Sequence, residues 1–569
     1  MLGAQLNRAW GGEFIGGVLE AAEAADVNVV CFVGGRPTSS AGSASEETSF
    51  GFYDLVKSGH YDGILLAADI GHGLTADELR SFHRLFTGLP LVTFAIPMDG
   101  STDFMADNEE GMRSIIRHLV EGHGLERIAF IRGIKGQIES ELRFKAYQDE
   151  LKNHRIRFEE RLVVEGDFST ESGRAATRIL LDRGIKFQAI AASNDRMAFG
   201  AMEALQQRGI QVPDAMALTG FDDVAEAESL GVPLTTVHQS FYESGRRTFE
   251  GLMKRIEGES LEPRILTPAK LVVRWSCGCL PESVKQAIVL PKEVAHTGRL
   301  ENKRDAAVRA LLAAGGIPED SPYRDRYREV FLKTWDVFLA SLGESDRSDA
   351  FLRMTQTVVE LLQLYRHDVT TWHNTFSTFR KFALGGITDQ AVMLRAENLF
   401  QQARMLVGEL SQRAQAFRRL QFVQQEEALG NFGYSIAPAM SLPEIGDAIS
   451  RHFPLLGITR WYLMFYNEPG SVGSRSTRMH ENYRLLMQYE DSVLQIPKEQ
   501  AVIATGRLVP QGRHFADRRY SSVIMPLTLA SNRFGFMWTE VGPRDWDIYV
   551  RVRNLLSSAL LRTTLVKQR

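Results

Sequence analysis

The chain has 569 residues, of which 24% are charged and 44% hydrophobic, and its formal net charge is −4. This length is too great for one hydrophobic core and predicts about three or four domains. The slightly acidic balance, without a long basic block, excludes the electrostatic footprint of a nucleic-acid-binding surface. The three cysteines exclude a disulfide framework and favour a reducing compartment.

The first residues, MLGAQLNRAW, lack the charged segment and apolar run of a secretory signal. No apolar run approaches the roughly 18 to 20 residues that would span a bilayer. We therefore expect a cytoplasmic protein with no membrane partner.

The first hundred residues alternate between strand and helix patterns. A loop containing Trp10 and Phe14 is expected to lead into a helix, and apolar runs at 27–35, 62–67 and 91–95 read as buried strands. This alternation predicts an α/β fold with a doubly wound parallel sheet.

The stretch 189–241 carries the strongest local signal. The apolar run Ala189–Ala192 ends at Asn194, a helical pattern follows, and Gly209 closes that helix. A second apolar run, 215–219, ends shortly before Asp222. Strand, helix and strand form a βαβ unit, and polar residues at the carboxyl ends of parallel strands face the ligand crevice.

Three motifs in this stretch carry a resemblance. NDRMAFGAMEAL (194–205), GFDD (220–223) and LTTVHQ (234–239) are similar to hallmarks of the effector-binding domain of the lactose-repressor/galactose-repressor family. That family shares its fold with periplasmic sugar-binding proteins. The resemblance covers roughly 1–276 and implies a two-lobed sensor domain that binds a small polar ligand, such as a sugar or nucleoside.

The resemblance also implies the ligand-binding residues. Trp10 corresponds to an aromatic ring that lies against the ligand, and Arg143 to an arginine that donates to ligand hydroxyls or carboxylates. Asn194 and Asp222 correspond to polar ligand contacts, and Gln239 and Phe241 to residues that line the cleft. Each of four has a structural alternative: Trp10 as a surface or interface aromatic, Arg143 as a partner of Glu139 or Glu141, Asp222 as a helix N-cap, and Gln239 as a support of the hinge backbone. We favour the ligand interpretation because the set converges on one cleft.

One departure from the family concerns the amino terminus. Family repressors begin with a helix-turn-helix and a hinge helix, whereas this sequence begins directly at the first expected strand. Operator binding is therefore not carried over, and we expect no direct contact with nucleic acid. No cofactor is expected.

The sensor domain ends in LVVRWSCGCL (271–280), where Cys277 and Cys279 flank a glycine. A zinc site needs about four ligands, and the other cysteine, Cys31, lies far upstream. The sequence therefore favours a structural turn or a redox-sensitive dithiol over a metal site. Residues 277–300 read as a linker.

Residues 301–430 are almost entirely helical in pattern, and their last helix, at about 389–429, has a heptad seam. The seam consists of Ala396, Leu399, Ala403, Leu406, Leu410, Phe417 and Leu420. Such a seam predicts a parallel coiled coil and a homodimer; the alternative is one helix of an intramolecular bundle.

Residues 431–545 resemble a GAF-like α+β sensor domain, with a helix at 441–458, a strand at 460–467 and two strands within 519–541. A thioether-linked bilin is excluded because no cysteine lies in 431–569. The histidines of this region are expected to be surface or core residues and not haem ligands: His452, His480 and His514.

The segment 546–569 is expected to be a signalling helix with a second seam, formed by Ile548, Val552, Leu555, Ala559 and Val566. No catalytic or phosphate-binding motif is found, so the chain is not expected to be an enzyme. We predict a sensor of bacterial signal transduction whose output is a partner protein or a further domain. The alternatives are a transcriptional regulator of the lactose-repressor type, acting through a partner or a missing output domain, and a scaffold without ligand.

Overall fold

The computed structural model describes residues 1–3, 9–34, 36–38, 47–49, 52–53, 55–58, 61–71, 74–289, 300–317, 319, 323–343, 348–364, 371–471, 482–490, 492–497, 502–504, 519–529 and 532–567. These residues form two compact units. One comprises Met1–Val272 with Gln424–Arg569, and the other comprises Val273–Val423.

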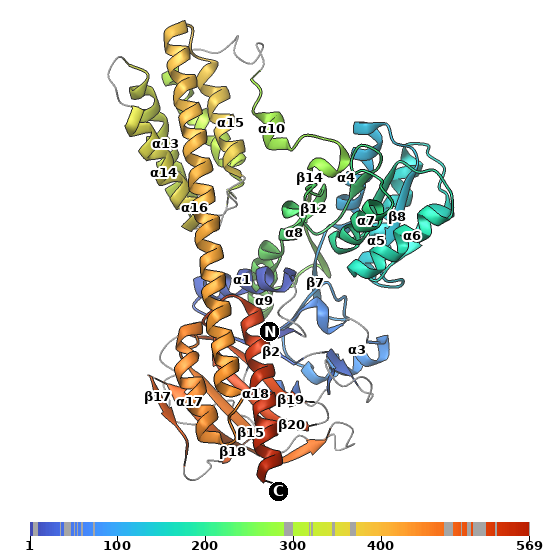
Figure 1. Ribbon diagram of the computed structural model, residues 1–569, viewed down its shortest axis with the longest axis vertical. Helices are drawn as coiled ribbons and strands as arrows, with labels where there is room; N and C mark the ends of the chain where they lie inside the picture. Colours follow the sequence, from blue (N-terminus) through green and yellow to red (C-terminus); the bar gives the residue numbers. More distant parts are fainter. Residues whose placement is uncertain are drawn as a thin grey trace. The chain divides into compact units, whose positions relative to one another are not determined.

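The first lobe of the larger unit is a parallel sheet flanked by helices (Figure 1). Its strands are β1 (Leu2–Gly3), β2 (Val29–Val33), β5 (Ile64–Leu66), β6 (Leu91–Phe94), β7 (Thr102–Ala106) and β13 (Arg264–Thr267), in the order β13-β7-β6-β5-β1-β2. Its helices are α1 (Ala9–Ala24), α2 (Leu55–Ser58), α3 (Ala76–His83) and α9 (Phe241–Ile256). A separate parallel pair joins β3 (Arg36–Thr38) to β4 (Glu47–Ser49).

Helices α1 and α9 pack so closely that only glycine fits at their contact. A Cβ atom on Gly17 would lie 1.9 Å from the carbonyl oxygen of Tyr242, and one on Gly245 would lie 2.0 Å from that of Phe14. Glycines in both sequences therefore determine how near the two backbones come.

The second lobe repeats the α/β pattern. Parallel strands β8 (Ile128–Arg132), β9 (Val163–Glu165), β10 (Ala189–Ala192) and β11 (Ala217–Thr219) follow the order β11-β10-β8-β9. Helices α4 (Asn108–Arg117), α5 (Ile138–Asn153), α6 (Thr170–Asp182), α7 (Asp195–Gln207) and α8 (Ala225–Ser229) accompany them. The antiparallel pair β12 (Thr236–Gln239) and β14 (Ala269–Val272) runs beside this lobe. The expected two-lobed, doubly wound α/β architecture is confirmed.

The carboxyl-terminal region of the same unit is an antiparallel sheet with helices. Its strands are β15 (Trp461–Ser471), β16 (Asn482–Glu490), β17 (Val493–Gln495), β18 (Val502–Ala504), β19 (Ser521–Leu529) and β20 (Asn532–Glu540). Its helices are the end of α16 (Gln390–Ile436), α17 (Leu442–His452) and α18 (Trp546–Lys567).

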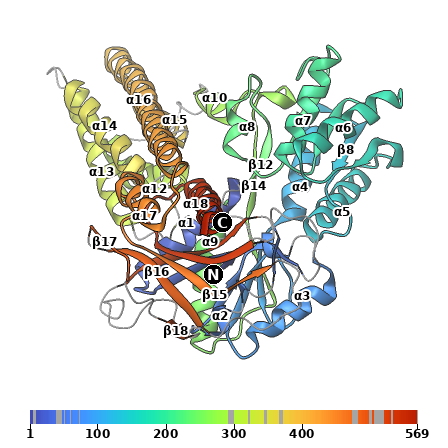
Figure 2. The ribbon, with the colours of Figure 1, turned by 60° about the horizontal axis from the view of Figure 1, so that its bottom comes forward.

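This region and the first lobe share one sheet, because β19 pairs in parallel with β2 from Ser521↔Val29 to Ile524↔Phe32 (Figure 2). The side chain of Asn28 accepts a hydrogen bond of 2.7 Å from the backbone N–H of Tyr520. A single hydrophobic core includes Phe14 of α1, Phe249 of α9 and Trp546 of α18. The first lobe and the carboxyl-terminal region therefore fold on a common core.

The smaller unit is helical. It contains α10 (Glu282–Gln286), α12 (Arg304–Ala314), α13 (Arg324–Ser341), α14 (Ser348–Leu364), α15 (Thr371–Leu384) and the first part of α16. Aromatic rings fill its core, with Trp335 and Phe338 of α13 packed against Phe379 of α15. No described helix is long and apolar enough to cross a membrane.

Several sequence-based expectations need correction. Trp10 and Phe14 lie in α1 and not in a loop. The first part of the α16 seam packs inside the helical unit, where Ala396, Leu399 and Ala403 are buried. This agrees with the bundle alternative for that part.

The terminal seam also packs internally. Ile548, Val552 and Ala559 are buried in the core of the larger unit, so these side chains are not exposed for a partner helix. His452 is partly buried against Phe432. His480, His514 and the side chain of Val566 lie outside the described residues.

Candidate functional site

The candidate ligand site is assembled where strands β10, β11 and β12 end. Ser193 and Asn194 follow β10, Asp222 follows β11, and Gln239 is the last residue of β12. Carboxyl ends of neighbouring strands meet at one edge of a sheet, where ligands bind in open α/β folds. Phe241 begins α9 two residues beyond Gln239, so one turn carries the chain from this edge to the first lobe.

Arg143 of α5 lies at the centre of the site and is only 3% exposed. Its Nε donates to Oδ1 of Asn108 at 2.7 Å, and its Nη1 donates to the carbonyl oxygen of Ser193 at 2.6 Å. Its guanidinium carbon lies 3.8 Å from the centroid of the Phe221 ring. A rigid, planar guanidinium is suited to such simultaneous contacts.

Two carboxylates lie beside this guanidinium. Oδ1 of Asp222 is 3.6 Å from Nη1, and Oε1 of Glu139 is 3.8 Å from Nη2 of Arg143. The alternative pairing with Glu139 is thus present in part, whereas Glu141 pairs with Arg132 at 2.6 Å. Arg143 joins α4, α5 and the strand ends, which is more than a pairing along one helix.

Asp222 and Gln239 form a direct pair. Nε2 of Gln239 donates to Oδ1 of Asp222 at 2.6 Å, and Asp222 adopts a positive φ of 117°. Burial raises the pKa of Asp222 to about 7, while Arg143 lowers it and Glu139 raises it. The residue before α8 is Val224, so Asp222 is not the N-cap of that helix. Gln239 bonds a site carboxylate with its side chain and does not serve only the hinge backbone.

Asn194 has a structural role at the edge of the site. Its Oδ1 accepts from the N–H of Met197 at 2.9 Å as the N-cap of α7, and its Nδ2 donates to the carbonyl oxygen of Phe168. The next residue, Asp195, is buried and accepts from Thr236 at 2.5 Å and from the N–H of Val224 at 2.9 Å. Asp195, which follows β10, is therefore hydrogen-bonded both to Val224, after β11, and to Thr236 of β12.

Trp10 and Phe241 belong to an aromatic cluster of the first lobe. The ring centroid of Trp10 is 6.1 Å from that of Phe241 and 6.0 Å from that of Phe94. Trp10 is therefore half-buried against other aromatic rings and is not an isolated surface aromatic. The aromatic pair and the polar network are linked through the short segment from Gln239 to Phe241.

Sequence reasoning missed several contributors: Asn108, Glu139 as a site carboxylate, Phe221 and His238. His238, the neighbour of Gln239 on β12, lies with its Nδ1 at 3.0 Å from Oδ2 of Asp223. The motif GFDD contained Phe221, but nothing in it indicated that its ring would stack on an arginine.

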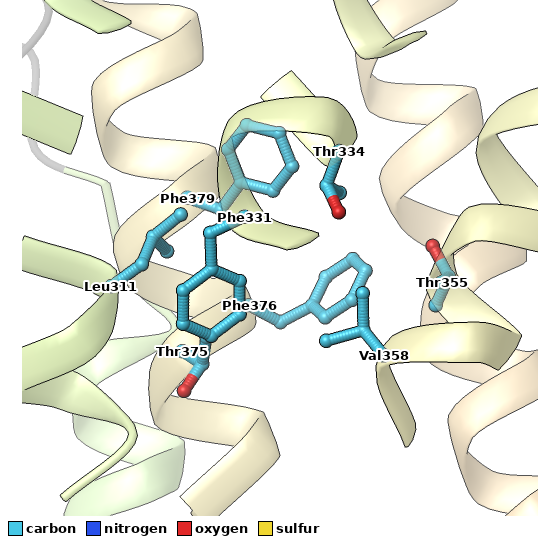
Figure 3. A pocket seen from close by; sticks show the side chains of 8 residues that line it. All are labelled: Leu311, Phe331, Thr334, Thr355, Val358, Thr375, Phe376 and Phe379. Carbon is cyan, nitrogen blue, oxygen red and sulfur yellow. The ribbon is translucent and has the colours of Figure 1, made fainter. Parts of the chain in front are cut away.

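The helical unit contains a different kind of concavity, shown in Figure 3. It is lined by Leu311, Phe331, Thr334, Thr355, Val358, Thr375, Phe376 and Phe379. The hydroxyls of Thr334 and Thr355 donate to carbonyl oxygens of their own helices at 2.8 and 2.9 Å. Because these hydroxyls are engaged, the lining is apolar in character and resembles a packing space of the core.

The two-lobed fold and the buried polar network at the strand ends define a periplasmic-binding-protein-like ligand-binding module. Residues 116–277 match the family model described as a periplasmic binding protein-like domain. The HTH-type transcriptional regulator CelR of Thermobifida fusca is 34% identical over 222 residues, which are 38% of this chain and 64% of CelR. AscG of Escherichia coli is 33% identical over 178 residues, which are 31% of this chain and 53% of AscG.

The probable HTH-type transcriptional repressor ExuR of Bacillus subtilis is 30% identical over 227 residues, covering 39% of this chain and 67% of ExuR. Through this module the chain belongs to the family of these transcriptional regulators. The chain spans less than two thirds of CelR and of AscG. Among solved structures, the CelR–cellobiose complex has a TM-score of 0.41 and 28% identity over 48% of this chain and 83% of that chain. A LacI-family regulatory protein from Chloroflexus aggregans has a TM-score of 0.41 and 27% identity over 48% of this chain and 95% of that chain.

Proposed function

We propose that this chain is a ligand-responsive regulator of the lactose-repressor type. It binds a small polar molecule, such as a sugar or nucleoside, at the network of Arg143, Asp222 and Gln239. The observation that carries the proposal is the burial of a guanidinium between an amide, a carbonyl and two carboxylates at the strand ends. Donors and acceptors held side by side suit a ligand with several hydroxyls.

The relatives support a regulatory role more than a catalytic one. CelR, AscG and ExuR are all named as transcriptional regulators or repressors. We infer that this chain responds to its ligand by a change of its two lobes and acts on transcription through a partner or a further domain. A ligand can shift such an equilibrium only by binding the two states with different affinity.

Trp10 and Phe241 are proposed to pass the ligand signal onward. Phe241 follows the site residue Gln239 by two positions and packs near Trp10 of α1. On the same helix, a Cβ at Gly12 would lie 3.2 Å from the Trp546 ring of α18. Helix α1 thus touches both the aromatic edge of the ligand site and the terminal helix. In this proposal the GAF-like region, 431–545, and α18 receive the signal.

A homodimer is proposed through the exposed part of α16. Phe417, Leu420 and Val423 follow one another at three-residue spacing on one side of α16 and are 59%, 52% and 43% exposed. Large apolar side chains exposed together on a helix favour a partner surface, and a second copy of α16 offers the same stripe for a coiled coil.

A thermal-shift screen tests the proposal with the full chain. The panel contains cellobiose, ribose, other sugars, nucleosides and amino acids. We expect at least one compound to raise the melting temperature of the wild type and to lose this effect in Asp222→Ala. Arg208→Ala is the control, because Arg208 pairs with Asp182 on the exposed surface of the same lobe. A chain that no panel compound stabilises would support a scaffold and contradict the proposal.

A further inference from the structure

The ligand site of the second lobe contains an acidic residue that the motif resemblance did not assign to it. Glu139 lies in the first turn of α5, one helical turn before Arg143. Its Oε1 is 3.8 Å from Nη2 of Arg143. At that distance the two groups attract each other but share no hydrogen bond. The carboxylate of Glu139 therefore faces the guanidinium without a close contact that would use up its acceptors.

Both carboxylates of the site keep one oxygen open. Oε2 of Glu139 accepts a long hydrogen bond of 3.5 Å from Nε2 of Gln137, and Oδ1 of Asp222 accepts from Gln239. Among the described residues, Oε1 of Glu139 and Oδ2 of Asp222 accept no hydrogen bond. The two side chains are 20% and 21% exposed, and neither of these oxygens is fully buried. Both are therefore acceptors that a ligand can reach.

The guanidinium beside these carboxylates has an open donor. Nε and Nη1 of Arg143 donate to Asn108 and to the carbonyl oxygen of Ser193, whereas Nη2 donates no hydrogen bond within the described part of the chain. The site thus presents a donor with an acceptor on either side. A complementary ligand has a central oxygen that accepts from Nη2 and a donor on either side of it, as three neighbouring hydroxyls provide.

The charges at this place are unequal. One guanidinium, that of Arg143, faces the carboxylates of Asp222 and Glu139, so the ionised site has an excess of negative charge. Arg196 is a further cation that acts on Asp222, but it is exposed, and salt and water screen its charge. A ligand with a negative charge of its own would meet a like charge in a partly dehydrated site, which weakens binding.

We propose that Glu139 determines the ligand class of this site: the site selects neutral or amine-bearing polyols and rejects ligands that carry a carboxylate or a phosphate. This inference rests on the proposed function, because it concerns the same ligand site. Hydroxyls donate to the two open carboxylate oxygens, and an amine in place of one hydroxyl adds a charge-assisted hydrogen bond.

Matched compounds that differ in one group test the proposal with the full chain. The sets are glucose, glucosamine and glucuronate; galactose, galactosamine and galacturonate; ribose and ribose 5-phosphate; and adenosine and its 5′-monophosphate. Dose-dependent thermal shifts give an apparent Kd at about pH 7.5, above the pKa of about 7 that burial gives Asp222. Within any set that binds, we expect the acid or phosphate to bind at least about tenfold more weakly than its neutral parent. The amine should bind at least as tightly as that parent.

Glu139→Gln separates the charge of this side chain from its size. The glutamine oxygen still accepts a hydrogen bond, so the affinity for the neutral parent should change little, whereas that for the acid should rise by at least about tenfold. Glu126→Gln is the matched control and should keep the wild-type preference. Glu126 is exposed and lies two residues before β8, at the edge of the sheet opposite the ligand site.

The results separate this inference from the proposed function. A wild type that binds an acid or phosphate as tightly as its neutral parent would overturn the inference and leave the ligand site in place. An unchanged preference in a folded Glu139→Gln variant would also overturn it. If no neutral, amino or acidic compound stabilises the chain, the proposed function is contradicted, and this inference is contradicted with it.

Discussion

Asp222 is the residue whose charge state most directly shapes the ligand site. Burial raises its pKa to about 7, well above the ordinary value of an aspartate. At a pH between the ordinary aspartate pKa and this raised pKa, Asp222 is protonated in the folded state but ionised in the unfolded chain. Stability therefore falls as pH rises through this window and levels off above the folded pKa.

Asp222→Asn removes this titration and keeps the size of the side chain. We expect the melting temperature of the wild type to fall more steeply than that of the variant between about pH 5 and about pH 8. Other buried acids, such as Asp103, titrate in both proteins and cancel in the comparison. Thermal melts across this range measure the difference. Asp182→Asn, on the exposed surface, should follow the wild type; identical pH profiles for wild type and Asp222→Asn would refute the assigned pKa shift.

At the scale of elements, the contact between α1 and α9 holds the first lobe together and carries the aromatic side of the site. Gly245→Ala would place a methyl group 2.0 Å from the carbonyl oxygen of Phe14. The helices would have to separate, which typically costs about 1–3 kcal/mol. We expect chemical denaturation to show this loss.

Gly430→Ala is the matched control in the same unit. Gly430 lies in α16, and nothing lies within 4 Å of the position its Cβ would occupy. Alanine is a better helix former than glycine by about 0.5–1 kcal/mol, so this variant should be as stable as the wild type or more so. Equal effects of the two substitutions would mean that the two helices are not in tight contact.

The elements also show what could be predicted from the sequence. The βαβ unit was predictable, because apolar runs, capping residues and Gly209 are local signals. Arg143, Asp222 and Gln239 were named correctly as residues that come together, through motif resemblance. The individual ligand contacts stay predictions.

Non-local contacts could not be read from the sequence. The pairing of β2 with β19 places Val29 beside Ser521. No feature in the sequence of either segment indicates that it pairs with the other. The buried face of α18 looked like a free seam, since an apolar stripe does not reveal whether its partner is internal or a second chain. Trp10 was assigned to a loop, since glycines in α1 weaken its helical pattern.

At the scale of the whole molecule, the exposed part of α16 predicts association. Light scattering should give about twice the chain mass of 63.8 kDa at micromolar concentration. Replacing Phe417 and Leu420 with Glu should shift the protein to the monomer, because like charges would face each other across the seam. Gln415→Glu, at another exposed position of the same helix, should leave the dimer largely intact. A wild type that stays monomeric would contradict this proposal.

The central claim is that the buried network around Arg143 is the ligand site, and calorimetric titration tests it most directly. A compound identified by thermal shift is titrated into the wild type, Arg143→Lys and Arg208→Lys. Lysine cannot reproduce the fork of bonds to Asn108 and the Ser193 carbonyl. Loss of charge-assisted bonds of about 1.5–3 kcal/mol predicts a ten- to hundredfold weaker affinity for Arg143→Lys. Arg208→Lys should bind like the wild type. Equal affinity of all three folded proteins would place the ligand elsewhere and contradict the claim.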